Sequence, residues 1–490
     1  MSKRLDDINQ QRLDKLDRLR TQGIEPYPNR YHRTHTIREA LALFEQDGSA
    51  SNLKLAGRIL AHRRMGKVTF IDLQDGSGKI QAYFRSTELG EEKYGMVQDL
   101  DIGDFIGATG ELFKTKTEEI TIRVSEFAIL SKALQSLPEK WHGLVDVEKR
   151  YRQRYLDLIS NKQTKDIFLL RSHTIAAMRR FLDDRGFIEV ETPVLHPIAG
   201  GARAHPFITH HQALDQDLYL RIATELYLKR LIIGGFDKVY EIGRIFRNEG
   251  ISTRHNPEFT MLECYEAYAD YDDMMHLLEE MISHIAREVL GTEKISFGNN
   301  NIDLTTPWQR ITLRDAVMKE SGIDLEECLK DGGPGLRDAM QTIGMELEET
   351  LSPAYLMDKL ASTFVEPKLV QPTFILDYPA DTTPLAKRKP DNKNFVERFE
   401  VFIGGMEVAN AFTELNDPEE QRDRFTEQEQ WRAVYGDEEA EAYQEDFITA
   451  MEHGMPPTGG LGVGIDRLVM LLANQSSIRE VILFPQLKTK

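Results

Sequence analysis

The first third of the chain contains short apolar runs separated by turn-forming residues. Five runs lie between residues 53 and 130, at Leu53–Ile59, Val68–Leu73, Ile80–Phe84, Phe105–Leu112 and Ile120–Ile129. Turn-forming residues follow the second run, at Asp75-Gly76-Ser77-Gly78, and precede the fourth, at Gly103-Asp104. A longer connection spans residues 86–102. Runs of this length and spacing predict five short strands. The pattern therefore predicts a small five-stranded β-barrel of the OB type.

The periodicity changes after this region and divides the chain into parts. Beyond it, longer helical patterns mix with strand patterns, which predicts a large α+β domain. With 490 residues and 41% apolar content, the chain is long enough for at least two domains. We expect a helical extension at residues 1–50, the barrel at 51–135, a linker at 136–160 and the α+β domain at 161–490, with a helical insertion near 315–360.

A basic loop followed by an alternating strand lies between Arg247 and Tyr265. The loop carries charged side chains at Arg247, Glu249, Arg254 and His255. Along the strand Phe259, Met261, Glu263 and Tyr265 alternate with Thr260, Leu262 and Cys264, so the two sets are expected on opposite faces. An isolated loop of this kind is usually a solvated hairpin tip. Above a patterned strand, it is also suited to holding an anion beside a flat ring.

Two further segments supply matching parts. Glycines alternate with apolar residues from Gly459 to Gly464, and a helical pattern follows in which we expect Asp466 to cap the helix carrying Arg467. Glycines at such positions let a ligand approach the backbone, and the alternative is that they allow tight packing of the strand on a helix. In the second segment, Gly404-Gly405 between apolar runs predicts a two-residue hairpin turn.

The predicted hairpin places two carboxylates near each other. In its register Glu407 is opposite Phe402, and Glu400 is the diagonal neighbour of Glu407 on the same face. Paired acids on a hairpin are more often solvated than metal-binding. With two arginine-bearing elements elsewhere in the chain, we favour a site in which Glu400 and Glu407 hold Mg²⁺.

Together these segments resemble the signature motifs of class II aminoacyl-tRNA synthetases, most closely those of the lysyl-tRNA synthetase branch. The degenerate third motif of that family is matched by a helix ending near Asp184 and the stretch Arg185–Pro193. The resemblance runs from about Tyr27 to the C-terminus and is least distinctive from Ser321 to Tyr355. It implies an antiparallel sheet flanked by helices, a homodimer, and ATP-dependent attachment of L-lysine to tRNA(Lys) through a lysyl-adenylate, with release of AMP and pyrophosphate.

The resemblance also implies which residues bind ATP. Arg247 would contact the α-phosphate and the substrate carboxylate, Glu249 the adenine amino group, and Phe259 one face of the adenine ring. Arg467 would cover the other face or reach the phosphates, and Arg254 and His255 would meet the β- and γ-phosphates. Glu400 and Glu407 would hold the Mg²⁺ that offsets the charge of the pyrophosphate. Arg247 and Arg467 are thus the expected catalytic residues.

Lysine selection is expected to depend on acids that the phosphate chemistry does not need. Three glutamates match the lysine-contacting residues of the family, namely Glu225, Glu263 and Glu414. The matching pocket walls are Gly201, Tyr265, Asn410, Phe412 and Gly462. The alternative for Glu225 is a glutamate on a helix surface beside Lys229. Glu407 and Glu414 are an odd number of positions apart, so a regular strand would direct their side chains to opposite faces of the sheet. For both to serve one site, the strand needs a bulge or twist between them, which we expect near Ala409-Asn410-Ala411.

For the barrel, the resemblance implies an anticodon-binding face. The matching positions are Arg63, Phe70, Gln81 and Glu126. On its residue pattern alone, Phe70 is about as easily explained as a core aromatic. The net charge of −19 is unusual for a protein that binds nucleic acid, but basic residues concentrate near the N-terminus. A helix at residues 2–21 would either help to orient an RNA or be a solvated charged helix.

Cysteine content and hydropathy give the expected location. Two cysteines form no disulfide framework, and neither a signal peptide nor a membrane span is evident, so we expect a cytoplasmic protein that does not bind membranes.

Three alternatives remain. An aspartate- or asparagine-type synthetase would lack this set of acids, and a paralogue that modifies lysine on a protein would not need the barrel. A non-catalytic RNA-binding or regulatory paralogue would be expected to have lost Arg247, Arg467 or the paired glutamates.

Overall fold

The structure, a computed structural model, describes residues 2–138, 144–329, 334–347, 353–435 and 442–488. The chain forms two compact units, Met1–Leu144 and Val145–Lys490. Most of the stretch Pro138–Gly143, where the linker was expected to begin, is outside the described residues, as are parts of the predicted insertion at 315–360.

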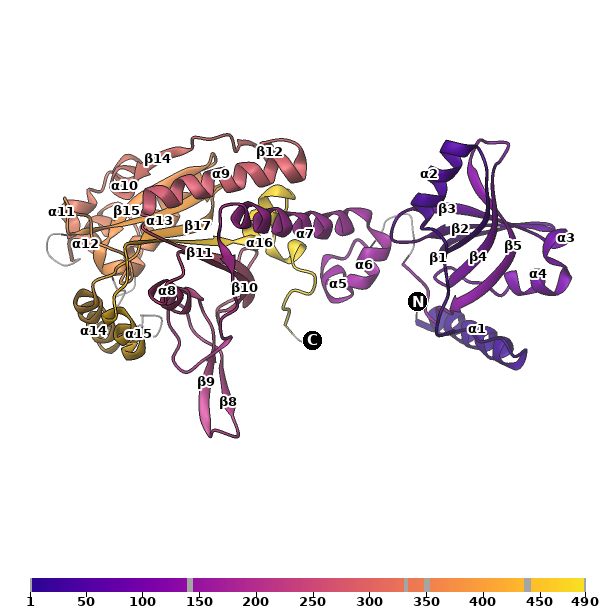
Figure 1. The fold of residues 1–490 in the computed structure, drawn as a ribbon, viewed down its shortest axis with the longest axis horizontal. Helices are drawn as coiled ribbons and strands as arrows, with labels where there is room; N and C mark the ends of the chain where they lie inside the picture. The colour runs from indigo at the N-terminus through magenta and orange to yellow at the C-terminus, as the bar shows by residue number, and fades with distance from the viewer. Residues whose placement is uncertain (1, 139–143, 330–333, 348–352, 436–441, 489–490) are drawn as a thin grey trace. The chain divides into compact units, whose positions relative to one another are not determined.

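The N-terminal unit contains the closed five-stranded barrel that the apolar runs predicted (Figure 1). Its strands follow the spatial order β1-β2-β3-β5-β4, and β3 pairs with β5 in parallel. They are β1 (Ala50–Met65), β2 (Val68–Gln74), β3 (Lys79–Arg85), β4 (Phe105–Lys114) and β5 (Ile120–Ser131). The long connection holds two short helices, α3 (Ser86–Leu89) and α4 (Glu91–Val97). Alternate side chains such as Leu55, Ile71 and Ile122 fill the barrel interior, which explains why the strand pattern was readable.

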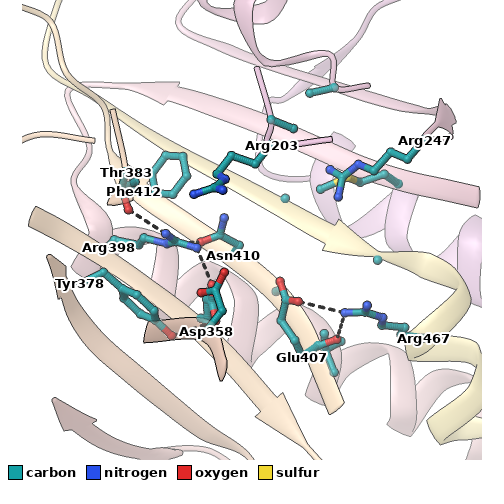
Figure 2. A pocket seen from close by; sticks show the side chains of 18 of the residues that line it. Arg203, Arg247, Asp358, Tyr378, Thr383, Arg398, Glu407, Asn410, Phe412 and Arg467 are labelled. Atoms are coloured by element: carbon teal, nitrogen blue, oxygen red, sulfur yellow. Dashed lines mark hydrogen bonds and ion pairs between the residues drawn. The ribbon is translucent and has the colours of Figure 1, made fainter. Parts of the chain in front are cut away.

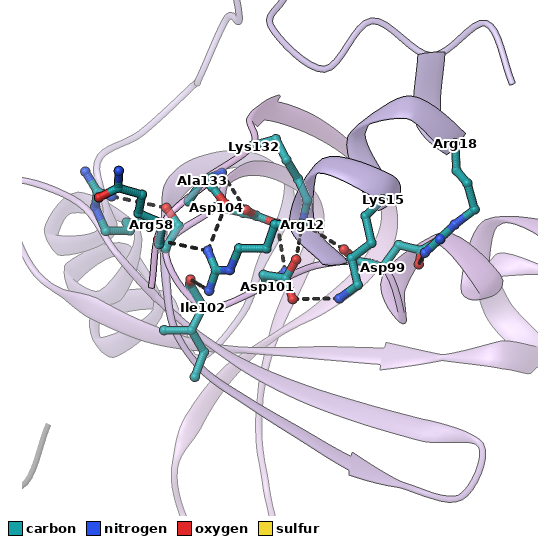
Figure 3. A network of polar contacts seen from close by, with 12 residues as sticks. Arg12, Lys15, Arg18, Arg58, Asp99, Asp101, Ile102, Asp104, Lys132 and Ala133 are labelled. Atoms are coloured by element: carbon teal, nitrogen blue, oxygen red, sulfur yellow. Dashed lines mark hydrogen bonds and ion pairs between the residues drawn. The ribbon is translucent and has the colours of Figure 1, made fainter. Parts of the chain in front are cut away.

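Two helices precede the barrel, α1 (Ser2–Thr21) and α2 (Ile37–Asp47). Three basic side chains of α1 contact the connection before β4 or the chain just after β5 (Figure 3). Arg12 donates to the carbonyls of Ala133 and Ile102 at 2.8 and 3.0 Å, and Lys15 and Arg18 form ion pairs with Asp101 and Asp99. These contacts favour an anchoring role for this side of α1. Of the two alternatives for this helix, a role in orienting an RNA and a solvated charged helix, neither accounts for Arg12, Lys15 and Arg18, which are engaged within the unit.

The second unit is built on an eight-stranded sheet with the order β14-β15-β16-β17-β18-β11-β10-β6. Its central pairs are antiparallel, as the resemblance implied, and the two edge pairs β14–β15 and β10–β6 are parallel. The strands are β14 (Gln309–Thr312), β15 (Thr373–Pro379), β16 (Phe395–Ile403), β17 (Met406–Thr413), β18 (Thr458–Gly464), β11 (Glu258–Ala267), β10 (Lys238–Phe246) and β6 (Ile188–Glu189). The expected α+β class is confirmed.

Three helices cover one face of this sheet, α7 (Lys162–Asp183), α9 (Tyr271–Leu290) and α16 (Ile465–Leu472) (Figure 1). Buried side chains such as Met281, Leu262 and Leu461 form the largest apolar core between these helices and the sheet. Because this face is filled by helices, polar side chains of the strands collect on the opposite face.

Smaller elements surround that opposite face. They are α8 (Glu225–Ile233), the helices α10 (Leu313–Ser321), α11 (Leu325–Leu329), α12 (Pro334–Thr342) and α13 (Pro353–Phe364), the short turns η1 (Glu366–Lys368) and η2 (Ala380–Thr382), and α14 (Pro418–Tyr435) and α15 (Glu445–Glu452). Helices α10 to α13 share an apolar cluster of their own with β15 and β16.

The remaining elements lie at the edges. Strands β7 (Leu195–His196), β8 (Ile208–His211) and β9 (Gln216–Leu220) form a separate sheet, and β8–β9 projects as a hairpin (Figure 1). The others are α5 (Val147–Arg152), α6 (Arg154–Ser160), β12 (Lys294–Phe297), β13 (Asn300–Asp303) and α17 (Ile478–Val481). Within the described parts of the chain, no helix has the length and apolar character needed to span a membrane.

Candidate active site and nucleic-acid interface

A cavity of about 720 Å³ opens on the polar face of the eight-stranded sheet (Figure 2). Of the site residues predicted in the second unit, every one lines it: Gly201, Glu225, Arg247, Glu249, Arg254, His255, Phe259, Glu263, Tyr265, Glu400, Glu407, Asn410, Phe412, Glu414, Gly462 and Arg467. The first and last of them, Gly201 and Arg467, are 266 positions apart in the sequence. The tertiary fold therefore brings the separate motifs to one site.

Strand β11 forms the centre of the cavity wall. Phe259, Met261, Glu263 and Tyr265 face the cavity, whereas Leu262 and Cys264 are completely buried in the helix-covered core. The alternation read from the sequence is confirmed, and each face of β11 has a different environment.

Arg247 and Phe259 form one end of the site. The guanidinium carbon of Arg247 is 5.3 Å from the centroid of the Phe259 ring, and its Nε donates to the Ile222 carbonyl at 3.4 Å. Burial lowers the pKa of Arg247, while the Glu249 carboxylate acts against the decrease. The arginine stays charged at neutral pH because its ordinary pKa is far higher. This end thus offers a planar cation beside an aromatic ring.

Arg467 is bound to the hairpin at the neighbouring end (Figure 2). Its Nη1 donates to the Glu407 carbonyl at 2.8 Å and to Glu407 Oε2 at 3.0 Å, and its Nη2 is 3.3 Å from His255 Nε2. Burial, and then the Arg467 charge, lower the pKa of His255. Arg254 donates to the Gly405 carbonyl at 3.1 Å. Several cations consequently surround one region, which is suited to a polyphosphate.

Asp466 does not cap helix α16, so that expectation is wrong. The N-cap position is Gly464, and Asp466, the second helical residue, is buried. Its Oδ2 accepts from the Thr260 amide at 2.6 Å, and its Oδ1 pairs with Arg171 at 2.6 Å. Asp466 therefore ties α16 to β11 and α7, because a tertiary partner offers a charged hydrogen bond that the local cap does not.

The Gly404-Gly405 turn forms as predicted, with positive φ at both residues, 62° and 72°. Phe402 is opposite Glu407, but Val401 is opposite Ala409, so one extra residue, Val408, is inserted in β17. The required bulge is thus present, one residue before the stretch where it was expected. Its insertion moves Glu400 opposite Asn410 and lets Glu407 and Glu414 share a cavity despite their odd separation.

Glu400 and Glu407 both line the cavity, and each also pairs with an arginine, Glu400 with Arg398 and Glu407 with Arg467. Burial raises the pKa of Glu400 to about 7, and the Glu407 charge adds to the rise. Two carboxylates that disfavour each other's charge are stabilised by a divalent ion between them. Across the described residues no group of three or more metal-ligating side chains occurs. The pair therefore suits Mg²⁺, which is commonly held by one or two carboxylates together with substrate phosphates.

Several cavity residues were not identified from the sequence. Arg398 was seen only as part of the hairpin, yet its Nε donates to Asn410 at 3.1 Å and its Nη1 to Thr383 at 2.7 Å, and it forms an ion pair with Glu400. It joins a predicted lysine-pocket residue to a predicted metal ligand. Other charged cavity residues that were not identified include Arg203, Asp358 and Glu366. No sequence signal distinguishes these residues from ordinary surface charges.

The three predicted pocket glutamates converge on another part of the cavity. Glu225 is 6% exposed, so the alternative of a helix-surface glutamate is wrong. The Glu263 carboxylate accepts from the Thr224 amide at 3.1 Å and lies 3.4 Å from the Tyr265 hydroxyl. Burial raises the pKa of Glu263 to about 7, and the Glu225 charge adds to the rise. Burial likewise raises the pKa of Glu414 to about 8.

Glycines of β18 make room for these carboxylates. A Cβ on Gly460 would lie 1.9 Å from Glu414 Oε1 and 2.5 Å from the Tyr265 ring. A Cβ on Gly462 would lie 2.6 Å from the Met261 side chain. The space at Gly460 and Gly462 is thus used by side chains that themselves line the cavity, whereas Gly459 packs tightly against the start of α9, where a Cβ would lie 2.9 Å from the Asp270 carbonyl oxygen.

On the barrel, the register places three of the four predicted residues on one face, where Gln81 is buried and its Nε2 donates to Glu119 at 3.1 Å. Arg63 is opposite Phe70, Phe70 is opposite Tyr83, and Gln81 is two residues from Tyr83. The rings of Phe70 and Tyr83 are 5.3 Å apart. Phe70 is only partly buried and the interior position is taken by Ile71, so the core alternative for Phe70 is wrong.

The fourth residue, Glu126, is placed differently. It is opposite Thr109 on β4 and 3.9 Å from Lys93 of α4. The residue of β5 opposite Tyr83 is Arg123, whose guanidinium carbon is 4.7 Å from the Phe113 centroid. Tyr83, Arg123 and Phe113 thus extend an aromatic and basic surface that the sequence did not reveal, because it depends on register.

Comparison with known proteins agrees with this geometry. Residues 146–488 match the family model of class II tRNA synthetases (D, K and N), and residues 53–130 match the OB-fold nucleic acid binding domain. The chain belongs to the class II tRNA synthetase family.

Full-length relatives carry a more particular name. Proteins named Lysine–tRNA ligase from Dehalococcoides mccartyi and Carboxydothermus hydrogenoformans are each 54% identical over 492 residues, covering 99% of this chain and 98% and 99% of the relative. One of the same name from Pelotomaculum thermopropionicum is 55% identical over 487 residues, covering 99% and 96%.

Proposed function

We propose that this protein is an ATP-dependent lysine–tRNA ligase, which attaches L-lysine to tRNA(Lys) through a lysyl-adenylate and releases AMP and pyrophosphate. The observation that carries the proposal is the convergence of three buried glutamates in a cavity whose other end is lined by arginines and an aromatic ring. An ammonium group needs several acceptors when it leaves water, and carboxylates also neutralise its charge.

In the first step, the carboxylate of lysine attacks the α-phosphorus of ATP and pyrophosphate leaves. Arg247 is positioned for the α-phosphate and the substrate carboxylate, with Phe259 stacking on adenine and Glu249 accepting from its amino group. Arg467, Arg254 and His255 would bind the remaining phosphates. Because the reaction requires no covalent bond to the enzyme, positioning and charge stabilisation supply most of its acceleration.

We assign Mg²⁺ to Glu400 and Glu407. The ion would offset the negative charge that develops on the leaving pyrophosphate. Arg398 and Tyr378, which contact Glu400, hold that carboxylate in the cavity wall: Tyr378 donates at 2.8 Å and Arg398 forms an ion pair.

Lysine selection is assigned to the other end of the cavity. Glu225, Glu263 and Glu414 would surround the side-chain ammonium, and the pocket walls would be Gly201, Tyr265, Asn410, Phe412 and Gly462. The apolar stem of lysine is suited to the aromatic walls.

In the second step, a ribose hydroxyl at the end of tRNA attacks the adenylate carbonyl. We assign residues 51–135 to anticodon binding, with Arg63, Phe70 and Gln81 on the reading face and Glu126 beside it. Stacking of bases on Phe70 agrees with its place on the outer surface of the barrel. Residues 161–490 would form the catalytic domain, with the helical insertion near 315–360.

We also propose that the protein is a cytoplasmic homodimer. The stretch matching the third family motif and the residues directly after it expose apolar side chains, Ile188 by 50%, Val194 by 40% and Ile198 by 45%. Neighbouring exposed apolar side chains are typical of protein–protein interfaces. Free Cys264 and Cys328 agree with a reducing compartment. Light scattering of the purified protein tests the dimer.

Amino-acid-dependent ATP–pyrophosphate exchange over all twenty amino acids, with Mg²⁺ and without tRNA, tests the proposed activity. We expect exchange with lysine alone. Exchange with aspartate or asparagine instead would overturn the assignment of the acidic pocket, and silence with every amino acid would support a non-catalytic paralogue.

A further inference from the structure

A lysine of the protein itself lies behind the acidic pocket. Lys229 is on α8, one turn after Glu225, and has no exposed surface. Its Nζ is 2.6 Å from Glu225 Oε1 and forms an ion pair with Glu414 Oε2. The centroid of the Phe447 ring is 6.0 Å away, on α15. A cation taken entirely out of water thus joins two of the three carboxylates assigned to the substrate.

The contacts of Lys229 leave part of each carboxylate for another partner. It binds one oxygen of Glu225 and one oxygen of Glu414, and both glutamates also line the cavity. A carboxylate has two oxygens and accepts several hydrogen bonds. Lys229 therefore orients the two groups from behind without filling the place where a ligand would approach.

Acidic side chains outnumber the cations that contact them at this point. Glu225, Glu263 and Glu414 supply three acids, and Lys229 is the cation in contact with two of them. Tyr265 faces the same group, and Arg247 acts on Glu263 from the other side. Removing one partner of a buried ion pair leaves an uncompensated charge, which is strongly unfavourable. Without Lys229, the ionised form of Glu414 would be less favoured, because the cation that acts against the rise in its pKa would be gone.

We propose that Lys229 is a positioning residue for lysine recognition, which orients Glu225 and Glu414 and favours the ionised form of Glu414 before the substrate ammonium arrives. This inference depends on the proposed function. Lys229 does not touch the substrate; it acts through the two glutamates.

The protonation states agree with this role. Burial lowers the pKa of Lys229, but the Glu225 and Glu414 charges more than offset this effect and the net pKa is raised, so the ammonium stays protonated. Burial raises the pKa of Glu414, and Lys229 acts against that rise. Replacing Lys229 by a neutral side chain would therefore move the titration of Glu414 to higher pH.

The test compares Lys229→Gln, which removes the charge, with Lys229→Arg, which keeps it, in lysine-dependent ATP–pyrophosphate exchange. For Lys229→Gln at pH 7.5 we expect the KM for lysine to rise about tenfold or more, because a shift of one pKa unit changes the ionised fraction by about that factor. The KM for ATP should change less than about twofold, since the phosphate end is unaltered. In Lys229→Gln, the increase in lysine affinity with pH should occur at a higher pH than in the wild type. Lys229→Arg should restore most of the loss.

Lys389→Gln is the matched control. Lys389 is largely buried and pairs with Asp377 at 2.8 Å in the same unit, but neither residue lines the cavity. We expect this variant to lose stability without a change in the KM for lysine. Equal KM values for wild type, Lys229→Gln and Lys229→Arg would overturn the inference, as would equal losses in the two Lys229 variants.

A further pair keeps the test decisive if Lys229→Gln does not fold. The double variant Lys229→Gln/Glu414→Gln removes one charge of each sign, a change that buried pairs often tolerate. Its KM for lysine should exceed that of Glu414→Gln alone, because Glu225 has also lost its cation; equal values would overturn the inference. Failure of the wild type to exchange with lysine would instead reject the proposed function itself.

Discussion

Arg467 donates from one nitrogen to both the backbone carbonyl and the carboxylate of Glu407, at 2.8 and 3.0 Å. These two residues, 60 positions apart, join helix α16 to the hairpin of β16 and β17. The double contact means that a residue assigned to phosphate binding also holds a residue assigned to Mg²⁺. A change at either position is therefore expected to affect both functions.

Replacing Arg467 by alanine should lower kcat/KM for ATP–pyrophosphate exchange about a hundredfold to a thousandfold, the usual cost of losing one preorganised charged donor. The KM for lysine should change little, because Arg467 is not among the contacts of the acidic end. Steady-state kinetics with each substrate varied in turn measures both effects. Arg422→Ala, on the surface near α15, serves as the control and should retain exchange.

Removal of either proposed metal ligand should change the magnesium requirement. In Glu407→Gln and Glu400→Gln, one negative ligand is lost, so the Mg²⁺ concentration for half-maximal exchange should rise about tenfold. Titration of exchange with Mg²⁺ at fixed ATP gives the value. An unchanged magnesium dependence in both variants would argue against this site.

Lysine binding should strengthen as pH rises from 6 to 8. The pKa values of Glu263 and Glu414 in the ligand-free protein are raised by burial to about 7 and about 8, so both carboxyls are largely protonated at pH 6. The lysine ammonium favours their ionised forms, so binding releases protons and affinity increases by up to about tenfold per pH unit for each proton.

Calorimetry in two buffers of different ionisation enthalpy counts the protons released when lysine binds.

The same pKa shifts have a consequence for stability. A carboxyl whose folded pKa is raised contributes stability at low pH, which is lost as pH rises through the folded value. The melting temperature of the ligand-free protein should therefore gain more from saturating lysine at pH 8 than at pH 6. An equal gain at both values would contradict the assignment of these two groups to the pocket.

Gly460→Ala should impair lysine binding. The new Cβ would overlap Glu414 Oε1, at 1.9 Å, and the Tyr265 ring, at 2.5 Å. Forced displacement of well-packed groups costs roughly 1–3 kcal/mol of stability, and here it also moves a carboxylate assigned to the substrate. Thermal unfolding and the KM for lysine should both respond. Gly95→Ala is the control, because a Cβ there meets nothing within 4 Å and α4 gains helix propensity.

Phe70→Ala should separate the two steps of the reaction. Loss of one stacking ring costs about 1–3 kcal/mol of single-stranded nucleic acid binding. Aminoacylation should therefore show a higher KM for tRNA, while tRNA-independent exchange with lysine stays at the wild-type rate. Ile71 is the neighbouring interior residue, and Ile71→Ala should instead lower the stability of the barrel.

Local patterns allowed several features to be predicted. Alternation along β11 identified which residues face the cavity, and the spacing of apolar runs identified the barrel, because side-chain direction in a strand follows directly from position. The odd number of positions between Glu407 and Glu414 also required a bulge, which is present at Val408. Family resemblance then supplied roles that the residue types alone would have left open.

What the sequence by itself determined about this protein is thus the direction of side chains within each strand, and with it the barrel and the cavity-facing residues of β11, while the resemblance to a family supplied the second sheet and most residues of the candidate site. Only the tertiary structure decided which distant charges meet: Lys229 behind Glu225 and Glu414, Arg398 between Asn410 and Glu400, and Asp466 bound to Arg171 instead of capping its helix. The physical reason is that a buried charge takes whichever partner the packing of the whole chain brings within hydrogen-bond distance, and no local periodicity records that distance.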